Sequence, residues 1–312
     1  MEGCQETPIN AHSIQQNGAL SLIESEINGN QSVYTFTELE LNVNNESVFR
    51  PIGKRQASTF FGFCNKHDTE IFQEIENSPN GIDLNTAKHK FLLSFRAFAI
   101  SYHRKKEDVK LFISADESLR KEIKKHSDID DEGYEKYISG SKIAVEEMKP
   151  QRDFLINALN TGDFDCLHFL SYSVDHSVQF TSTMYTSPPY LFSGEEINIS
   201  EDTNFEYSDI ISTVIPLQNR AIVVLASFKD RPKGIKYLEE IDSFQKREKE
   251  IALTWHFLTN SENVFFSPNA FNSLPEGQQR KIIELYLDSK DLNKPYLKFD
   301  SKKFDINLFE KP

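Results

Sequence analysis

The chain of 312 residues is long enough to bury a substantial core, in one large domain or in two smaller ones. With 38% hydrophobic residues, including 25 Phe and 11 Tyr, the composition excludes an intrinsically disordered chain. The formal net charge of −13 argues against broad, sequence-independent binding to nucleic acid, because such binding depends on neutralising phosphates.

Cysteine usage and hydropathy indicate a cellular location. Three cysteines argue against a disulfide framework, and the chain does not open with a basic segment followed by an apolar one. No stretch approaches the ~18 apolar residues of a membrane-spanning helix. We therefore expect a cytoplasmic protein with free thiols and no membrane partner.

The first 84 residues are expected to form loops and short strands. Residues 32–36 and 38–43 alternate apolar and polar side chains and are flanked by Asn/Gly clusters, which predicts two strands.

Helices are predicted for the middle of the chain. After an N-cap candidate at Asn85, aromatic residues recur at helical spacing and predict a helix over 86–107. A shorter polar helix is expected over 116–126. Apolar residues then continue at helical spacing over 134–159, which predicts one long helix that Pro150 either kinks or splits.

In the second half of the chain, segments rich in aromatic and β-branched residues replace the helical periodicity. Four aromatic and β-branched segments are predicted to be strands: 164–174, 178–186, 209–216 and 221–228. Gln218 and Asn219 lie between the last two and predict a hairpin turn, so we expect an antiparallel sheet. A long helix is predicted over 235–258 and a last one over 278–287, before a weakly ordered tail from residue 290.

A Cys-x2-His motif at Cys64 and His67 places two metal-capable side chains at the spacing of a tight knuckle. A second pair, Cys4 and His12, lies near the start, and two pairs supply the four ligands of a closed structural zinc site. Zinc is therefore the expected cofactor. Asp68 is either a hydrogen-bond partner of the ligating imidazole or a solvated acid, and we favour the solvated acid.

A simpler interpretation competes with this metal site. Free Cys is among the most frequently buried residue types, so Cys64 could be an ordinary core thiol and His67 merely polar. Cys4 lies close to the first residue, where a segment can fray.

The element Ala-His-Ser-Ile-Gln at residues 11–15, followed by Gly-Phe-Cys-x2-His-Asp at 62–68, resembles uncharacterised bacterial proteins that carry both elements. The same region, within the first 75 residues, weakly resembles treble-clef and HNH-type zinc modules. The HNH resemblance implies that His12 is the general base of a metal-dependent nuclease. This chain departs from that pattern, since no second Cys lies near Cys4 and no Asn directly precedes Cys64. These departures favour His12 as a zinc ligand.

Basic side chains lie beside aromatic ones in the segment before and within the knuckle. They are Arg50, Lys54, Arg55 and Lys66, next to Phe60, Phe61 and Phe63. Such a patch can hold a nucleic-acid strand. The alternative is a solvated basic edge over core aromatics, which the acidic total charge favours.

These observations together predict an α+β fold. It has a zinc-closed N-terminal lobe of loops and short strands, a helical middle, and an antiparallel sheet packed by long helices. We place the lobe and its first long helix in residues 1–110, and the helix-plus-sheet domain in 111–312.

The sequence contains no phosphate-binding glycine loop, no Gly-x-Ser-x-Gly elbow and no His-Glu-x2-His helix. The predicted function is therefore a zinc-stabilised binding or sensing protein, non-enzymatic, with an unidentified ligand. A protein partner, or nucleic acid at the basic patch, is the candidate partner. The alternative is an HNH-like nuclease using His12. On the 235–258 helix, Trp255 is expected in the core and His256 at the surface.

Overall fold

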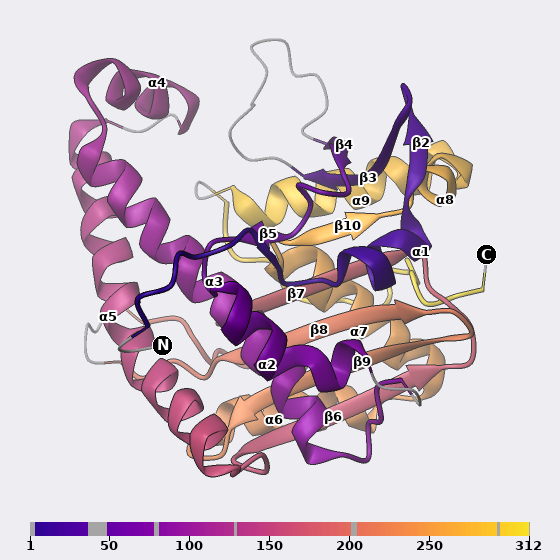
Figure 1. Cartoon of the computed structure of the whole chain (residues 1–312). Coiled ribbons are helices and arrows are strands. Elements are labelled where there is room, and N and C mark those ends of the chain that lie inside the picture. Colours follow the sequence, from indigo (N-terminus) through magenta and orange to yellow (C-terminus); the bar gives the residue numbers. More distant parts are fainter. Residues whose placement is uncertain are drawn as a thin grey trace.

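The computed structural model describes residues 4–36, 49–77, 81–127, 130–200, 205–291 and 294–311. Over these residues, long helices accompany an antiparallel sheet, which confirms the α+β class (Figure 1). The strand predicted over 38–43 lies outside the described residues.

The strands are β1 (Ala11–His12), β2 (Ser25–Ile27), β3 (Asn30–Phe36), β4 (Phe49–Gly53), β5 (Thr59–Phe60), β6 (Leu167–Val174), β7 (Phe180–Thr186), β8 (Ile210–Leu217), β9 (Arg220–Phe228) and β10 (Val264–Phe266). The helices are α1 (Ser21–Ile23), α2 (Asn65–Glu76), α3 (Ala87–Ser114), α4 (Glu117–Ser127), α5 (Asp131–Thr161), α6 (Pro232–Ser243), α7 (Lys246–Asn260), α8 (Pro268–Ser273) and α9 (Glu276–Lys290). A π-helical turn, η1 (Gln16–Leu20), precedes α1.

Within the described part of the chain, an eight-stranded sheet has the order β2-β3-β10-β7-β8-β9-β6, and β4 also pairs with β3. β1 and β5 form a separate two-stranded ladder. Leu217 faces Arg220 in the β8–β9 register, so the predicted two-residue turn between these strands is confirmed. β3 pairs with β10, so strands from both sides of residue 110 share one sheet.

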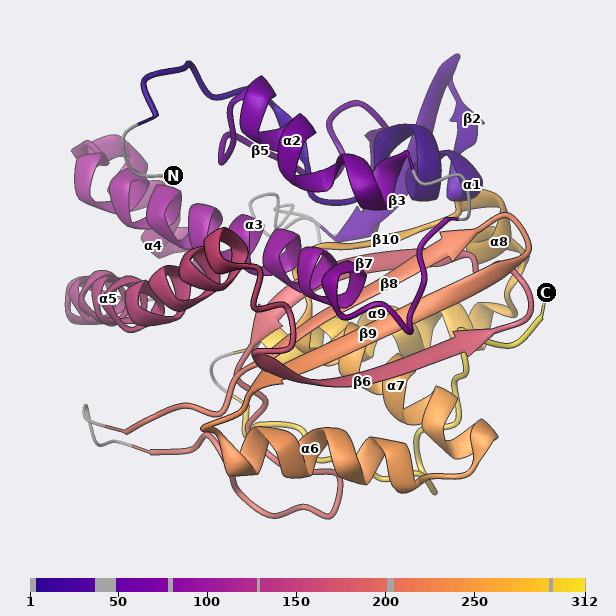
Figure 2. The same cartoon turned by 60° about the horizontal axis from the view of Figure 1, so that its bottom comes forward.

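β9 is apolar along most of its length because both faces of the sheet are buried. Val223 and Leu225 point into one core cluster, and Ile222 and Val224 point into another. Helices α6, α7 and α9 lie on the first face, and α2, α3 and α5 lie on the second (Figure 2).

α5 runs without interruption through Pro150, so the alternative in which Pro150 splits this helix is wrong. Asp130 is the N-cap residue of α5, and its carboxylate accepts a hydrogen bond from the Gly133 backbone N–H at 2.8 Å. The C-cap residue of α5 is Gly162, which takes the left-handed backbone conformation (φ 76°) that glycine adopts without a steric cost. α3 and α5 pack against each other and extend beyond the sheet together with α4 (Figure 1).

The single helix predicted over 235–258 is wrong, because the chain breaks between α6 and α7. Phe244 and Gln245 take extended backbone conformations there. The break lets the Phe244 ring pack against Phe192 and Phe299, with centroids 5.8 and 6.4 Å away.

The expectation of a weakly ordered tail is also wrong. Phe304, Ile306 and Phe309 are buried against the sheet, and the Phe309 ring lies 5.2 Å from Phe180. Burial of one such side chain contributes about 1.5–3 kcal/mol, which holds this irregular segment in place without a helix or strand.

Among the described residues, no helix combines the length and the apolar character needed to cross a bilayer.

We predict that Gly234→Ala lowers the free energy of unfolding by about 1–3 kcal/mol, because α6 packs tightly on β9. A Cβ at position 234 would lie 2.1 Å from Ser227 Oγ and 3.2 Å from Ser227 Cβ. Urea unfolding measures the effect. Gly140→Ala is the control, since nothing lies within 4 Å of a Cβ there, and it should stabilise α5 by up to about 1 kcal/mol. Equal stability of Gly234→Ala and the wild type would contradict this packing.

Candidate metal centre and ligand cavity

The N-terminal segment runs antiparallel beside the segment that leads into α2. β1 pairs with β5, Pro8 forms an isolated bridge with Cys64, and the Ile9 N–H donates to the Phe63 carbonyl at 2.8 Å. Because of this pairing, Cys4 lies close to the N-terminus of α2.

Cys4, Cys64 and His67 form a group that could hold a metal ion. Their ligand atoms all lie within 4.8 Å of one another. Cys4 Sγ is 3.7 Å from Cys64 Sγ, which is 3.2 Å from His67 Nδ1. Three of the four residues proposed from the sequence are thus brought together.

The start of α2 fixes the Cys-x2-His spacing. Cys64 is the N-cap residue, and its sulfur accepts the backbone N–H of His67 at 3.5 Å. The first turn of a helix favours negative charge, so this position suits a thiolate ligand.

His12 lies outside this three-residue group. Burial lowers the pKa of its imidazole, and hydrogen bonds with the Arg55 and Lys54 backbone oppose that shift. Its Nε2 atom is buried and has no hydrogen-bond partner among the described residues. The ring therefore retains an unused nitrogen next to the metal-binding segment.

Asp68 is half-buried and faces Arg96 rather than open solvent. Its Oδ1 atom lies 4.0 Å from Arg96 Nη2, which also bonds Glu76 Oε1 at 2.7 Å. Burial raises the pKa of Asp68, while the Arg96 charge opposes this rise. Arg96 is itself buried and stacks over Phe72, 3.9 Å from the ring centroid.

The residues of the predicted basic patch lie on separate elements. Arg50 is on β4, Lys54 and Arg55 follow β4, and Lys66 is in the first turn of α2. Lys54 is neutralised by Glu24, with 2.6 Å between Nζ and Oε2. The part of the patch at Lys54 is therefore not available to phosphates.

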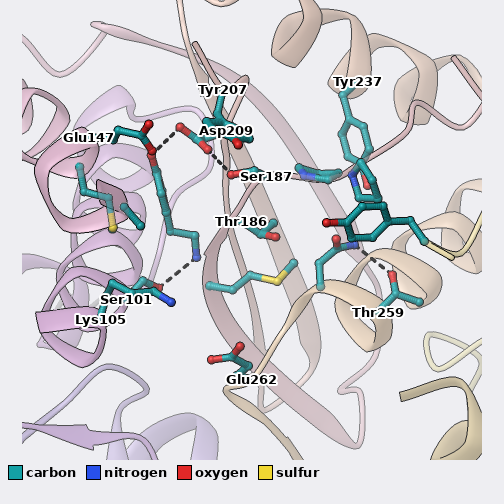
Figure 3. A pocket seen from close by; sticks show the side chains of 18 of the residues that line it. Ser101, Lys105, Glu147, Thr186, Ser187, Tyr207, Asp209, Tyr237, Thr259 and Glu262 are labelled. Carbon is teal, nitrogen blue, oxygen red and sulfur yellow. Dashed lines mark hydrogen bonds between the residues drawn. The ribbon is translucent and has the colours of Figure 1, made fainter. Parts of the chain in front are cut away.

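A cavity of about 900 Å³ lies where β7 ends and where β8 and β10 begin (Figure 3). Residues of α3 and α5 line one side, and residues of α6 and α7 line the other. Figure 3 shows Glu147 beside Asp209 on the first side, and Tyr237 and Thr259 on the second. The volume falls in the range of small-molecule sites, about 300–1,000 Å³.

Asp209 is the most buried charged group of this cavity, at 3% exposure. Its carboxylate accepts hydrogen bonds from Tyr185 Oη and Ser187 Oγ, each at 2.5 Å. Burial raises the pKa of Asp209, and these two hydrogen bonds oppose the rise. Burial, and then the charge of Asp209, raise the pKa of Glu147.

A buried histidine fixes the side chain of Tyr237, which lines the cavity. Tyr237 Oη and Ser212 Oγ each lie 2.8 Å from a ring nitrogen of His256. Burial lowers the pKa of His256 to about 3, so the ring is neutral and fixes the tyrosine by hydrogen bonding. The expectation that His256 lies at the surface is wrong, since it is fully buried.

A buried polar cluster joins the N-terminal segment to this cavity. Asn263 Nδ2 lies 2.7 Å from Thr183 Oγ1, 3.2 Å from Ser58 Oγ and 3.3 Å from Ser13 Oγ. Asn263 and Thr183 line the cavity, and Ser13 directly follows His12. The N-terminal segment, which also carries Cys4, is therefore hydrogen-bonded to residues that line the cavity.

The sequence reasoning missed the residues of the cavity. One available signal was Asp209, a carboxylate directly before a buried apolar strand, where strand ends collect polar groups. Glu147, on a long amphipathic helix, had no distinguishing signal in the sequence.

Comparisons with protein-family models, with curated proteins and with solved structures find no match for this chain.

We predict that iodoacetamide alkylates Cys4 much faster than Cys166 in metal-stripped protein at pH 8. Cys4 is exposed, whereas Cys166 is buried. Burial, with a smaller contribution from Asp163, raises the pKa of Cys166 to about 11, so about 0.1% of it is thiolate at this pH. Peptide mass spectrometry at timed intervals measures both rates. Comparable labelling of the two cysteines would contradict the described burial.

Proposed function

We propose that this chain is a zinc-stabilised binding protein, with zinc on Cys4, Cys64 and His67 and a ligand in the cavity at the end of β7. The observation that carries the proposal is the convergence of two thiols and one imidazole, from opposite ends of a segment of about sixty residues. Zinc would supply folding free energy, because it links a segment that is otherwise held by few hydrogen bonds.

The donor set fits zinc. Two sulfurs on one tetrahedral zinc, with bonds of about 2.3 Å, lie about 3.8 Å apart, and a sulfur and a nitrogen lie about 3.6 Å apart. The distances here are 3.7 Å for Cys4–Cys64 and 3.2 Å for Cys64–His67. Thiolate and imidazole ligands together favour zinc over magnesium or calcium. A cytoplasmic location, where thiols stay reduced, is part of the proposal.

His12 remains our proposed fourth ligand. Its buried Nε2 atom accepts no hydrogen bond from the described residues, which leaves the lone pair available. Hydrogen bonds between its ring and the backbone of Arg55 and Lys54 are the kind of support that orients a ligating imidazole. Water is the other candidate for the fourth position.

The local structure holds the N-terminal segment only weakly, so a zinc ion between Cys4 and the start of α2 would stabilise it. The β1–β5 ladder pairs only two residues on each strand, and Cys4 is exposed. Ladders this short are marginal on their own. A metal bond between Cys4 and the start of α2 would hold the segment that also carries Ser13 to the sheet.

The HNH-like nuclease is the alternative, and the position of His12 outside the three-residue group is the observation that favours it. A general base must reach water or substrate within hydrogen-bond distance. Burial of Nε2 and the ion pair of Lys54 with Glu24 both count against this role. The binding protein is therefore the preferred function.

We predict that the wild type purifies with about one zinc per chain and that Cys64→Ser loses it. Because zinc binding is linked to folding, the variant should melt about 5–10 °C lower. Elemental analysis and differential scanning calorimetry measure the two effects. Cys166→Ser is the matched control and should keep its zinc, since this cysteine is outside the group. Wild-type protein that binds no zinc would refute the proposal.

We predict that His12→Ala weakens zinc binding about 10–100-fold, as the loss of a ligand or its support does. Competition with a chromophoric chelator measures the affinity. In parallel, the wild type should leave supercoiled plasmid and single-stranded RNA intact with Mg²⁺ or Mn²⁺. Cleavage that His12→Ala abolishes while zinc is retained would establish the nuclease instead.

A further inference from the structure

Five carboxylates line the cavity at the end of β7, and most of them form no ion pair among the described residues. Asp108, Glu147, Asp209 and Glu262 line it, and none of the four forms an ion pair within the described ranges. A fifth carboxylate, Glu206, is already paired with Arg231 at 2.9 Å.

Four cations also line the cavity, Arg104, Lys105, Arg231 and Lys290, one fewer than its carboxylates. Arg231 is held by Glu206 and by Asp230, the latter at 3.3 Å. Lys290 lies over the Tyr286 ring, 5.6 Å from its centroid. Burial raises the pKa of Asp108, and the charges of Lys105 and Arg104 oppose that rise. Burial, and then the charge of Asp209, raise the pKa of Glu147.

The carboxylates occupy two places in the cavity. Glu147 and Asp209 form one pair. At the other place, burial raises the pKa of Asp108, with a smaller contribution from the charge of Glu262. Figure 3 shows Glu262 on the other side of Thr186 from Glu147 and Asp209. A ligand that satisfies both places therefore needs positive charge at two separated points.

A further buried acceptor belongs to a residue that lines the same cavity. Asn263 is 4% exposed, and its Oδ1 atom accepts no hydrogen bond from any described residue. Carboxylates and an amide oxygen together favour a ligand rich in N–H donors over one that carries phosphate or carboxylate groups.

Aromatic rings line the space between the helical layers, among them Tyr207, Tyr237 and Trp255. Such rings bind methylene chains through apolar contact and ammonium groups through their π faces. The Trp255 and Tyr237 rings are fixed by neighbours, since Phe299 lies 5.6 Å from Trp255 and Phe192 lies 5.0 Å from Tyr237.

We propose that this cavity binds a linear polyamine, with ammonium groups at the Glu147–Asp209 and Asp108–Glu262 pairs and methylene segments against the aromatic rings. This inference rests on the proposed binding function and names its ligand class. An inorganic dication lacks the apolar body, and a neutral polyol lacks the charge.

The test is isothermal titration calorimetry of the full chain at about 150 mM NaCl, a concentration that screens general attraction to an acidic surface. Spermidine and putrescine are the probes. n-Butylamine, 1,4-butanediol and MgCl₂ are controls for one charge, no charge and charge without an apolar chain. We expect 1:1 binding of spermidine, at least tenfold tighter than binding of n-butylamine, and no measurable binding of the diol.

Two variants test whether spermidine binds in the cavity. Glu147→Gln and Glu262→Gln should each weaken spermidine binding at least fivefold, and neither position is in the hydrophobic core. Glu117→Gln is the matched control, because Glu117 is exposed on α4 and pairs with Lys121 there. Its affinity should equal that of the wild type.

Three results would overturn the inference: no 1:1 binding of spermidine or putrescine, equal affinity for the diol, or an equal loss in Glu117→Gln and Glu147→Gln. Zinc content is measured on the same samples. Spermidine binding in protein that holds no zinc refutes the metal centre alone. Absence of binding in zinc-loaded protein refutes the polyamine site alone.

Discussion

The buried amide of Asn263 is the interaction on which the arrangement of the two sites depends. It joins Ser13 of the N-terminal segment, Ser58 before β5 and Thr183 of β7, and all four residues are at most 4% exposed. Ser58 has a left-handed backbone (φ 59°), a conformation that costs about 1–3 kcal/mol outside glycine. Its hydroxyl and its carbonyl, which accepts the Ser13 N–H at 2.9 Å, offset this cost.

This cluster explains how one chain positions a metal-binding segment and a ligand cavity together. Because both faces of the central strands are covered by helices, buried polar side chains gather at the strand ends, where Asp209 and Asn263 lie. The segment that carries Cys4 and His12 then enters the same region through Ser13. Zinc at the start of α2 would hold that segment in place, and a ligand in the cavity would bind against residues fixed by it.

The elements with strong periodicity were predictable from the sequence. The aromatic repeat of α3 and the β8–β9 hairpin followed from local patterns, and each is confirmed. The break at Phe244 was not predictable, since it depends on contacts with Phe192 and Phe299 that lie far away in sequence. The same holds for the buried tail and for His256, whose burial depends on Tyr237 and Ser212 as partners.

Part of the candidate metal site could also be predicted from the sequence. The Cys-x2-His spacing is local, and pairing of Pro8 with Cys64 brings in Cys4. His12 shows the limit of the sequence pattern, because it lies outside the three-residue group and its ring interacts with the backbone of Arg55 and Lys54. The cavity had no motif at all, since its carboxylates come from α3, α5, the start of β8 and the approach to β10.

X-ray absorption at the zinc edge, on the purified full chain, tests the central claim most directly. The account predicts two sulfur scatterers at about 2.3 Å with one or two nitrogen scatterers at about 2.0–2.1 Å. A zinc shell of oxygen and nitrogen alone, or protein with no zinc to measure, would contradict it.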